Sequence, residues 1–350
     1  MTTMPLISVA MPVYNGEKFV GEAIESILNQ SYSDFEFIII DDGSTDNSLE
    51  VLKSYAEKDK RIRLISRENR NVAATLNEIA SLSSGYWYAR MDQDDIAMPE
   101  RFESQLRWLE KTGADICGSW AKRFGTYDQR VVRTDISDQD IKLNMLFMCP
   151  LIHPSIMMRT EVVKRLHYDE TGWEAEDYDF WERSAELGLR FTNCPEILLR
   201  YRVHPSQISS SNSQRQHKLT MKIQSRYWNF LLQDFNVEDE EINEIIGARW
   251  NPNQLHSIDF LNKALVELCC NHFPSKANEI LGHAKGIYFL IAPHHKKAYK
   301  YWNELNGQLG LKTKKIDIAL IWFLGFFNVN LKAKIFYRLR FFYIRFLSRS

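Results

Sequence analysis

The sequence predicts an α/β protein in which a mostly parallel sheet is flanked by helices and followed by a helical C-terminal extension. Two observations support this prediction. Short apolar runs rich in β-formers alternate with stretches of helical spacing over residues 7–91, and polar turns follow the first, second and fourth of these runs. Such alternation indicates parallel strands joined by helices, and the carboxyl ends of those strands meet at one edge of the sheet, where ligands bind.

The N-terminal part has the clearest elements. The run at 7–13 ends in a turn signal at Gly16, and the run at 35–40 is apolar almost throughout, as expected of a strand covered on both faces. Apolar side chains in residues 17–30 recur at the spacing of one buried helical stripe. We expect strands at 7–13, 35–40, 62–65 and 87–91, separated by helices at 17–30, 48–58 and 72–82.

The following part has weaker signals, of which Pro99 in the first turn of a helix is one. We expect further helices at 99–111, 139–147 and 174–187, strands at 116–118, 153–158, 191–193 and 197–203, and an exposed hairpin at 125–134. Beyond a Ser-rich stretch at 206–213, interpreted as a linker or a mobile loop near the site, helices are expected at 218–232, 238–246, 254–270 and 277–289.

Length and composition are those of a folded protein with more than one part. Of the 350 residues, 45% are hydrophobic and 25% are charged, which excludes a disordered chain. We expect an α/β domain at 1–210, a helical region at 211–310 and a basic, aromatic segment at 311–350. A formal net charge of −1 gives no general attraction to nucleic acid, so no nucleic-acid partner is expected.

Several features favour the cytoplasm. The five cysteines are scattered and odd in number, as in a reducing compartment. The first apolar run is too short for a signal peptide, and no run reaches the ~18 apolar residues of a spanning helix.

The C-terminal segment has the composition of a membrane-surface helix, because it interleaves Lys332, Lys334 and four arginines with aromatic residues. We therefore expect peripheral attachment to the cytoplasmic, inner face of the membrane. The alternative is a helix packed on its own protein, with a solvated basic face.

Three carboxylates follow the fourth expected strand. Asp92, Asp94 and Asp95 lie within four residues, just before Pro99. Like charges this close repel each other unless a cation or hydrogen-bond donors gather them, and Mg²⁺ and Mn²⁺ prefer carboxylate oxygen. The alternative is a solvated acidic turn that caps the next helix. On these residues alone both alternatives stay open, and the turn lies at the ligand-binding edge of the sheet.

Four motifs in order resemble the family 2 glycosyltransferases, which have the GT-A fold. They are the strand and turn at 7–15, Asp41-Asp42-Gly43, Asp92-Gln93-Asp94-Asp95, and the Glu176-Asp177 pair at a helix start. The resemblance covers residues 7–204. It implies a nucleotide-sugar donor, with UDP favoured, a Mn²⁺ or Mg²⁺ cofactor and inversion at the anomeric carbon. It also implies a glycan or lipid-linked glycan acceptor in bacterial surface-polysaccharide synthesis.

The resemblance also implies a donor site. Asp42 matches the position that accepts a hydrogen bond from the uracil N–H, with capping of the next helix as its alternative role. Tyr14, in the same motif as Pro12, is expected to stack on the base unless it belongs to the core. Arg70 or Arg67 is expected to contact phosphate or base.

Metal and acceptor roles follow in the same way. Asp94 and His204 match positions that contact the metal or diphosphate, and Asp92 is expected to orient the ribose or a metal-bound water. Asp95 is expected to cap the following helix. His204 has a purely structural role as its alternative.

Asp177 matches the base that takes a proton from the acceptor hydroxyl. Glu176 is expected to contact the sugar or acceptor, and Asp179 to point away from the site. Trp173 and Trp181 are candidates for an acceptor platform, although Trp181 equally suits the core. The alternative for the acidic cluster is a favourable interaction with the helix dipole.

Other classes of protein fit less well. A nucleotidyltransferase should have a Gly-rich loop after the first strand, where only Gly16 stands, and neither a G-x-G-x-x-G turn nor a P-loop is present in the sequence. The remaining alternative is a non-catalytic carbohydrate-binding or scaffold protein with a transferase-like fold. Loss of an acidic site residue would favour it, yet Asp92, Asp94 and Asp177 are all present.

Overall fold

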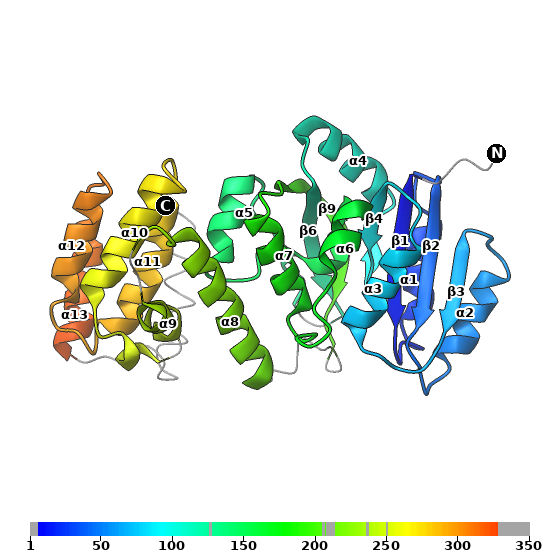
Figure 1. Ribbon diagram of the computed structural model, residues 1–350, viewed down its shortest axis with the longest axis horizontal. Coiled ribbons are helices and arrows are strands. Elements are labelled where there is room, and N and C mark those ends of the chain that lie inside the picture. The colour runs from blue at the N-terminus through cyan, green and yellow to red at the C-terminus, as the bar shows by residue number, and fades with distance from the viewer. Residues whose placement is uncertain are drawn as a thin grey trace. The chain divides into compact units, whose positions relative to one another are not determined.

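The computed structural model describes residues 6–125, 128–204, 207, 214–235, 238–249 and 251–327. The chain divides into two compact units, Met1–Ile223 and Gln224–Ser350. The basic part of the C-terminal segment, at 331–350, and most of the Ser-rich stretch lie outside the described residues. Within the described parts, the predicted α/β fold with flanking helices and a helical C-terminal region is confirmed (Figure 1).

The N-terminal half of the first unit is a parallel sheet with strand order β3-β2-β1-β4. Every element expected over residues 7–91 is present. The elements are β1 (Ile7–Val13), α1 (Val20–Leu28), β2 (Phe35–Asp41), α2 (Ser48–Ala56), β3 (Ile62–Ser66), α3 (Val72–Leu82) and β4 (Trp87–Arg90). Because these strands are parallel, the turns after β1, β2 and β4 leave the sheet at the same edge.

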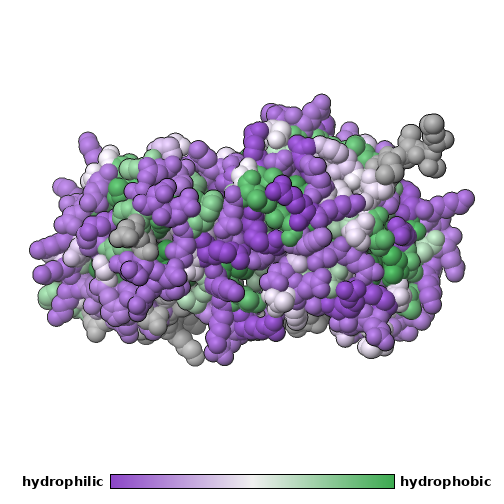
Figure 2. Space-filling model, in the orientation of Figure 1, coloured by the Kyte–Doolittle hydropathy of each residue, from purple (hydrophilic) through white to green (hydrophobic). Residues whose placement is uncertain are grey.

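Burial explains the regularity of this half. Val9 and Phe37 in the two central strands are completely buried, and burying one large apolar side chain contributes roughly 1.5–3 kcal/mol. Helix α1 covers the sheet with one stripe, namely Val20, Ala23, Ile24 and Ile27. The outer surface visible in Figure 2 is mainly hydrophilic and has only separate apolar patches.

The other half of the sheet is mixed. It continues as β4-β8-β6-β9-β5, with β7 beside β6, and β8 runs antiparallel to both of its neighbours. The sheet is therefore less uniformly parallel than the sequence indicates. The elements are β5 (Ile96–Ala97), α4 (Arg101–Thr112), β6 (Ile116–Phe124), β7 (Val131–Val132), α5 (Asp138–Met145), η1 (His153–Ser155), β8 (Met157–Arg159), α6 (Thr160–Leu166), α7 (Glu176–Glu186) and β9 (Phe191–Arg202).

Several expectations for this half are wrong. Residues 153–158 do not form one strand, because Pro154 lacks a ladder N–H and the chain first makes the 3₁₀ turn η1. The stretches 191–193 and 197–203 join into the single strand β9, whose register against β6 shifts next to Trp120. The strand β5 and the helix α6 are too short to give a periodic signal.

The described residues of the second unit are helical. Four expected helices are present, and α12 is an addition whose Ala298, Trp302 and Leu305 are buried at helical spacing. No helix in the described part of the chain is both long and apolar enough to cross a membrane. The helices are α8 (Gln214–Leu231), which begins before the boundary between the units, α9 (Asp239–Ala248), α10 (Ile258–Asn271), α11 (Ala277–Ile291), α12 (Ala298–Gln308) and α13 (Lys315–Phe327), with a 3₁₀ turn at Pro252–Gln254.

Gly85, between α3 and β4, has no room for a side chain. A Cβ atom added there would lie 2.6 Å from the Ser8 nitrogen and 2.7 Å from the Ile7 carbonyl carbon. Both atoms belong to the backbone of a central strand, so they cannot move aside without disturbing the sheet. We predict that Gly85→Ala lowers the free energy of unfolding by about 1–3 kcal/mol in chemical denaturation.

Gly21→Ala is the matched control in the same unit. A Cβ atom at Gly21 meets only the end of the Tyr55 side chain, at 3.4 Å, and a helix favours alanine over glycine. This variant should be at least as stable as the wild type. If Gly85→Ala were equally stable, the close packing of Gly85 on β1 would be refuted.

Candidate active site

The turns after β1 and β2 are fastened to each other at the carboxyl edge of the sheet. The Asn15 N–H donates to the Ser44 hydroxyl at 3.0 Å, and the Thr45 N–H donates to the Asn15 side-chain oxygen at 2.8 Å. The Gly16 N–H donates to the Ser48 hydroxyl at 2.8 Å. Asn15 has a φ of 52°, which asparagine tolerates better than most residues. The polar turns therefore converge.

Gln93 joins the acidic turn after β4 to the turn after β1. Its side-chain oxygen accepts a hydrogen bond from the Tyr14 N–H at 2.9 Å, and its side-chain nitrogen donates to the Tyr14 carbonyl at 3.0 Å. Gly16 leaves room for this contact, because a Cβ atom there would lie 2.5 Å from the Gln93 oxygen. Tyr14 is 48% exposed, so a core role for this tyrosine is wrong.

Asp42 is held beside the turn after β3 and does not cap a helix. Arg67 pairs with its Oδ1, and the Arg70 N–H donates to the same oxygen at 2.8 Å. Helix α2 is preceded by Asn47, so the alternative capping role is wrong. The Arg67 side chain also pairs with Glu78 at 2.7 Å, whereas that of Arg70 is 55% exposed. Of the two arginines, Arg70 is the more accessible to a ligand.

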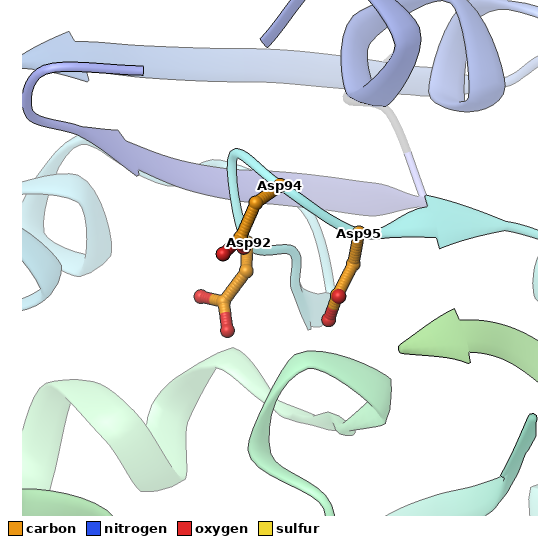
Figure 3. Close-up of side chains that lie close together, drawn as sticks. All are labelled: Asp92, Asp94 and Asp95. Carbon is orange, nitrogen blue, oxygen red and sulfur yellow. The ribbon is translucent and has the colours of Figure 1, made fainter. Parts of the chain in front are cut away.

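Asp92, Asp94 and Asp95 are close enough to share a cation. One carboxylate oxygen from each lies within 4.8 Å of the others, and their side chains leave one turn toward the same side (Figure 3). Two full charges at that distance repel each other by about 3–4 kcal/mol at an effective dielectric constant of ~20. Because Mg²⁺ and Mn²⁺ prefer carboxylate oxygen, this set of donors fits such an ion.

Asp95 differs from its expected role. Its Oδ1 accepts the Arg202 N–H of β9 at 2.8 Å, while its Oδ2 is buried without a hydrogen-bond partner among the described residues. Helix α4 begins only at Arg101, so the predicted cap is wrong. Burial, together with the charges of Asp92 and Asp94, raises the pKa of Asp95 well above its usual value. A proton or a cation would compensate this carboxyl group.

His204 reaches the acidic turn from beyond the end of β9. Its Nε2 lies 2.8 Å from Asp94 Oδ2, and a hydrogen bond to a carboxylate requires the proton on that nitrogen. The Arg202 Nε donates to the Asp94 carbonyl at 2.6 Å, and the His204 ring packs 4.9 Å from that of Phe19. The two residues predicted to bind the metal are therefore in contact.

Two buried arginines stand behind the acidic turn. Arg90 pairs with Asp92 and also donates to the Met91 carbonyl. Arg101 is completely buried and donates to the Arg90 carbonyl at 2.7 Å and to the Ile156 carbonyl at 3.2 Å. Burial lowers the pKa of Arg101 to about 9, so it stays charged at neutral pH. These cations offset the carboxylates and hold the backbone where β4 ends.

The first turn of α7 adds two more carboxylates. Glu176 approaches His153 Nδ1 at 3.8 Å, and Asp177 Oδ2 accepts a hydrogen bond from the Cys149 thiol at 3.5 Å. Burial raises the pKa of both carboxyls, and for Glu176 the charge of Asp177 adds to the effect. Burial and neighbouring charges, Asp177 among them, also raise the pKa of Asp92. Helix α7 and the acidic turn therefore face one site.

The remaining predicted residues lie around this site or outside it. Pro12 is in β1 and Trp173 is in the loop before α7, and both are partly exposed. Trp181 is completely buried, so it belongs to the core and its candidate role in an acceptor platform is wrong. Asp179 pairs with Arg183 at 2.7 Å, which agrees with its expected direction away from the site.

Four side chains that shape the site are not apparent as such from the sequence, namely Gln93, Cys149, His153 and Arg202. Their partners are distant in the chain: 79 residues separate Gln93 from Tyr14, and 108 separate Arg202 from Asp94. Only Gln93 had a local signal, because it stands between two candidate site residues.

Known proteins resemble this chain over most of its length. Residues 8–166 match the family model described as glycosyl transferase family 2. An uncharacterized glycosyltransferase from Haemophilus influenzae is 33% identical over 284 residues, which cover 77% of this chain and 85% of that protein. The O-antigen biosynthesis glycosyltransferase WbnJ of Escherichia coli is 31% identical over 215 residues, which cover 59% and 84% of the two chains.

Two solved structures share the fold. S. aureus TarS 1-349 in complex with UDP-GlcNAc has a TM-score of 0.57 at 16% identity, covering 88% of this chain and 93% of that one. The mannosyltransferase PcManGT from Pyrobaculum calidifontis, in complex with GDP-Man and Mn²⁺, has a TM-score of 0.50 at 17% identity, covering 92% and 88%.

The matched family model includes the strands that end in the Asp42 turn and the acidic turn. Together with the 33% identity across 77% of its length, this match shows that the chain belongs to glycosyl transferase family 2.

Proposed function

We propose that this glycosyltransferase is metal-dependent and inverting, and that it moves a sugar from a UDP-sugar to a hydroxyl of a glycan or lipid-linked glycan. The observation that carries the proposal is the pair of carboxylate groups around buried Arg90: the acidic turn that includes Asp94, and Asp177 at the start of α7. In a displacement reaction, one of these groups would serve the leaving diphosphate and the other the attacking hydroxyl.

The turns after β1 and β2 would bind the donor nucleotide, together with Pro12 near the end of β1. The exposed Tyr14 ring is suited to stack on a base, and the Asp42 carboxylate to accept a hydrogen bond from a uracil N–H. The exposed guanidinium of Arg70 suits a phosphate. The TarS complex with UDP-GlcNAc supports uracil as the base.

Asp94 and His204 would hold Mn²⁺ or Mg²⁺, while Asp92 orients the ribose. When bound, the ion offsets the negative charge that builds on the departing diphosphate. His204 would bind it as neutral imidazole, with its proton on Nδ1 in place of Nε2. The Oδ2 of Asp95, buried without a hydrogen-bond partner in the described part of the chain, supports a cation nearby, as does the Mn²⁺ in the PcManGT complex.

Asp177 would act as the base. It accepts the proton of the acceptor hydroxyl while that oxygen attacks the anomeric carbon from the side opposite the diphosphate, which inverts the configuration. Its raised pKa makes it a stronger base than an exposed aspartate. Glu176, which directly precedes it, and Trp173, four residues before it, would contact the sugar or the acceptor.

The acceptor would belong to a bacterial surface polysaccharide, made at the cytoplasmic face of the membrane. The name of the O-antigen relative supports this part of the proposal. The competing candidate is a non-catalytic carbohydrate-binding or scaffold protein with the same fold, which would bind ligands without turnover.

The first prediction concerns the donor site. UDP with Mn²⁺ should raise the unfolding temperature by several degrees, because a ligand at about a hundred times its dissociation constant adds about 2.7 kcal/mol to stability. A chelator, or the variant Asp94→Asn, should abolish most of this shift in thermal denaturation. Asp34→Asn, in the exposed loop before β2, is the matched control and should keep it. If UDP, GDP and dTDP all left the unfolding temperature unchanged, the donor site would be wrong.

The second prediction concerns the base. Asp177→Asn should lower kcat by about 10²–10⁴-fold, the usual contribution of a general base, and keep the UDP-dependent stabilisation. The matched control is Asp179→Asn, on the same helix but paired with Arg183, which should keep kcat within a few-fold when assayed below its unfolding temperature. Unchanged turnover in Asp177→Asn would remove this residue from the mechanism.

The third prediction concerns pH. Asp177 works only as the carboxylate, so activity should fall as the pH drops through its raised pKa. The Cys149 thiol donates to this carboxylate and thereby favours the charged form. Cys149→Ala should therefore raise the pKa of Asp177 further and move the acidic limb of the kcat/KM profile to higher pH.

Cys270→Ala, which changes an exposed cysteine outside the site, is the control for that profile and should leave the limb in place. If the acidic limb of Cys149→Ala also lay at the wild-type pH, the Cys149 thiol would not affect the pKa of Asp177.

A further inference from the structure

Helix α13 is apolar on two faces, and only one of them is packed against other described residues. Ile321 and Leu324 are buried, as is Asp317, whose carboxylate pairs with Lys285 at 2.5 Å. The outward face repeats at helical spacing and carries large apolar side chains that are 44–64% exposed, namely Ile316, Trp322, Phe323, Phe326 and Phe327. A helix that is hydrophobic all round normally has a covered outer face as well.

The four aromatic rings form one continuous patch. The ring centroids of Trp322 and Phe326 lie 5.1 Å apart, those of Phe323 and Phe327 4.7 Å, and those of Phe326 and Phe327 5.0 Å. Scattered exposed apolar residues are normal on a protein surface, but a contiguous aromatic patch indicates a binding surface. We call these four residues the aromatic face of α13.

The start of α13 and the residues just before it are basic. Lys312, Lys314 and Lys315 at the start of α13 are exposed. Between Lys312 and Ser350 the sequence has nine basic residues and one acidic residue. The acidic residue is Asp317, whose charge is already neutralised inside the unit by Lys285. The charge of this part of the chain therefore favours a negatively charged partner.

We propose that the aromatic face of α13 docks the protein on an anionic membrane surface. Trp and Phe side chains enter the boundary between headgroups and acyl chains, while neighbouring lysines and arginines attract acidic lipid. A symmetric contact with a second copy would bring two basic segments together, and residues 328–350, which contain six of the basic residues, have the same sign as the lysines of α13. Charge therefore favours acidic lipid as the partner of the aromatic face over a second copy of the chain and over residues 328–350.

This inference goes beyond the proposed transfer reaction, because it concerns the surface on which the enzyme works, and its test needs no activity. The full-length protein is mixed with phosphatidylcholine vesicles that either contain or lack phosphatidylglycerol, and the bound fraction is measured by flotation. The wild type should bind the anionic vesicles, bind less at high salt, and bind neutral vesicles weakly. Trp322→Ser/Phe326→Ser should lower the partition coefficient roughly tenfold or more, because it removes two large apolar side chains.

The matched control is Ile136→Ser/Leu187→Ser, which removes two exposed apolar residues from the first unit and should bind like the wild type. Circular dichroism confirms that each variant is folded.

Failure of the wild type to bind anionic vesicles would overturn the proposal. A third variant, Arg338→Gln/Arg340→Gln/Arg345→Gln, tests residues 328–350. If it lost binding while Trp322→Ser/Phe326→Ser bound fully, the proposal would also be overturned, because residues 328–350 alone would then make the contact. A wild-type dimer that dissociates in the α13 variant without binding vesicles would identify the face as a contact between copies.

Discussion

Mutual repulsion of the carboxylates at the end of β4 constrains the rest of the first unit. Asp92, Asp94 and Asp95 stay together only because positive charge and N–H donors are provided from other elements: Arg90 from β4, and Arg202 from β9. An unpaired buried charge costs about 3–5 kcal/mol, which is comparable to the repulsion between two of the carboxylates. Neither the acidic group nor its cations would be stable here alone, so the site and this part of the fold depend on each other.

The turns around the carboxylates are held by many individually weak bonds. Each hydrogen bond such as those of Gln93 to Tyr14, or of Asn15 to the turn after β2, contributes only about 0.5–1.5 kcal/mol net. Together they join the β1, β2 and β4 turns into one body before any ligand arrives. A site arranged in advance loses less entropy on binding and positions its groups for reaction. In a donor-binding enzyme, this arrangement would place the base-binding and diphosphate-binding parts at a set distance.

The second unit serves a different physical purpose. Its described helices bury apolar stripes against one another, with Trp302 and Tyr288 buried. Its most unusual element, α13, keeps an acidic residue inside and aromatic residues outside, the reverse of an ordinary surface helix. Such an inversion has a thermodynamic cost in water, and it would be relieved if something apolar covered the helix.

Local pattern was sufficient for the parallel half of the sheet. The elements over residues 7–91 follow from periodicity and turn residues, which are properties of neighbouring positions, and the order of the motifs predicted the family. The same reasoning identified the turn of Asp92 and Asp94 and the pair at the start of α7, because each directly adjoins a strand end or a helix start.

Tertiary structure decided what surrounds those carboxylates. Asp95 was expected to cap a helix but instead accepts an N–H from Arg202, and Trp181 lies in the core. The Gln93 contact with Tyr14 and the Cys149 thiol on Asp177 likewise join residues distant in the chain. The sequence by itself determined which groups are acidic and at which edge they lie. Only the folded chain decided which of them are neutralised and by what, because strand order and burial bring those partners together and no local pattern encodes either one.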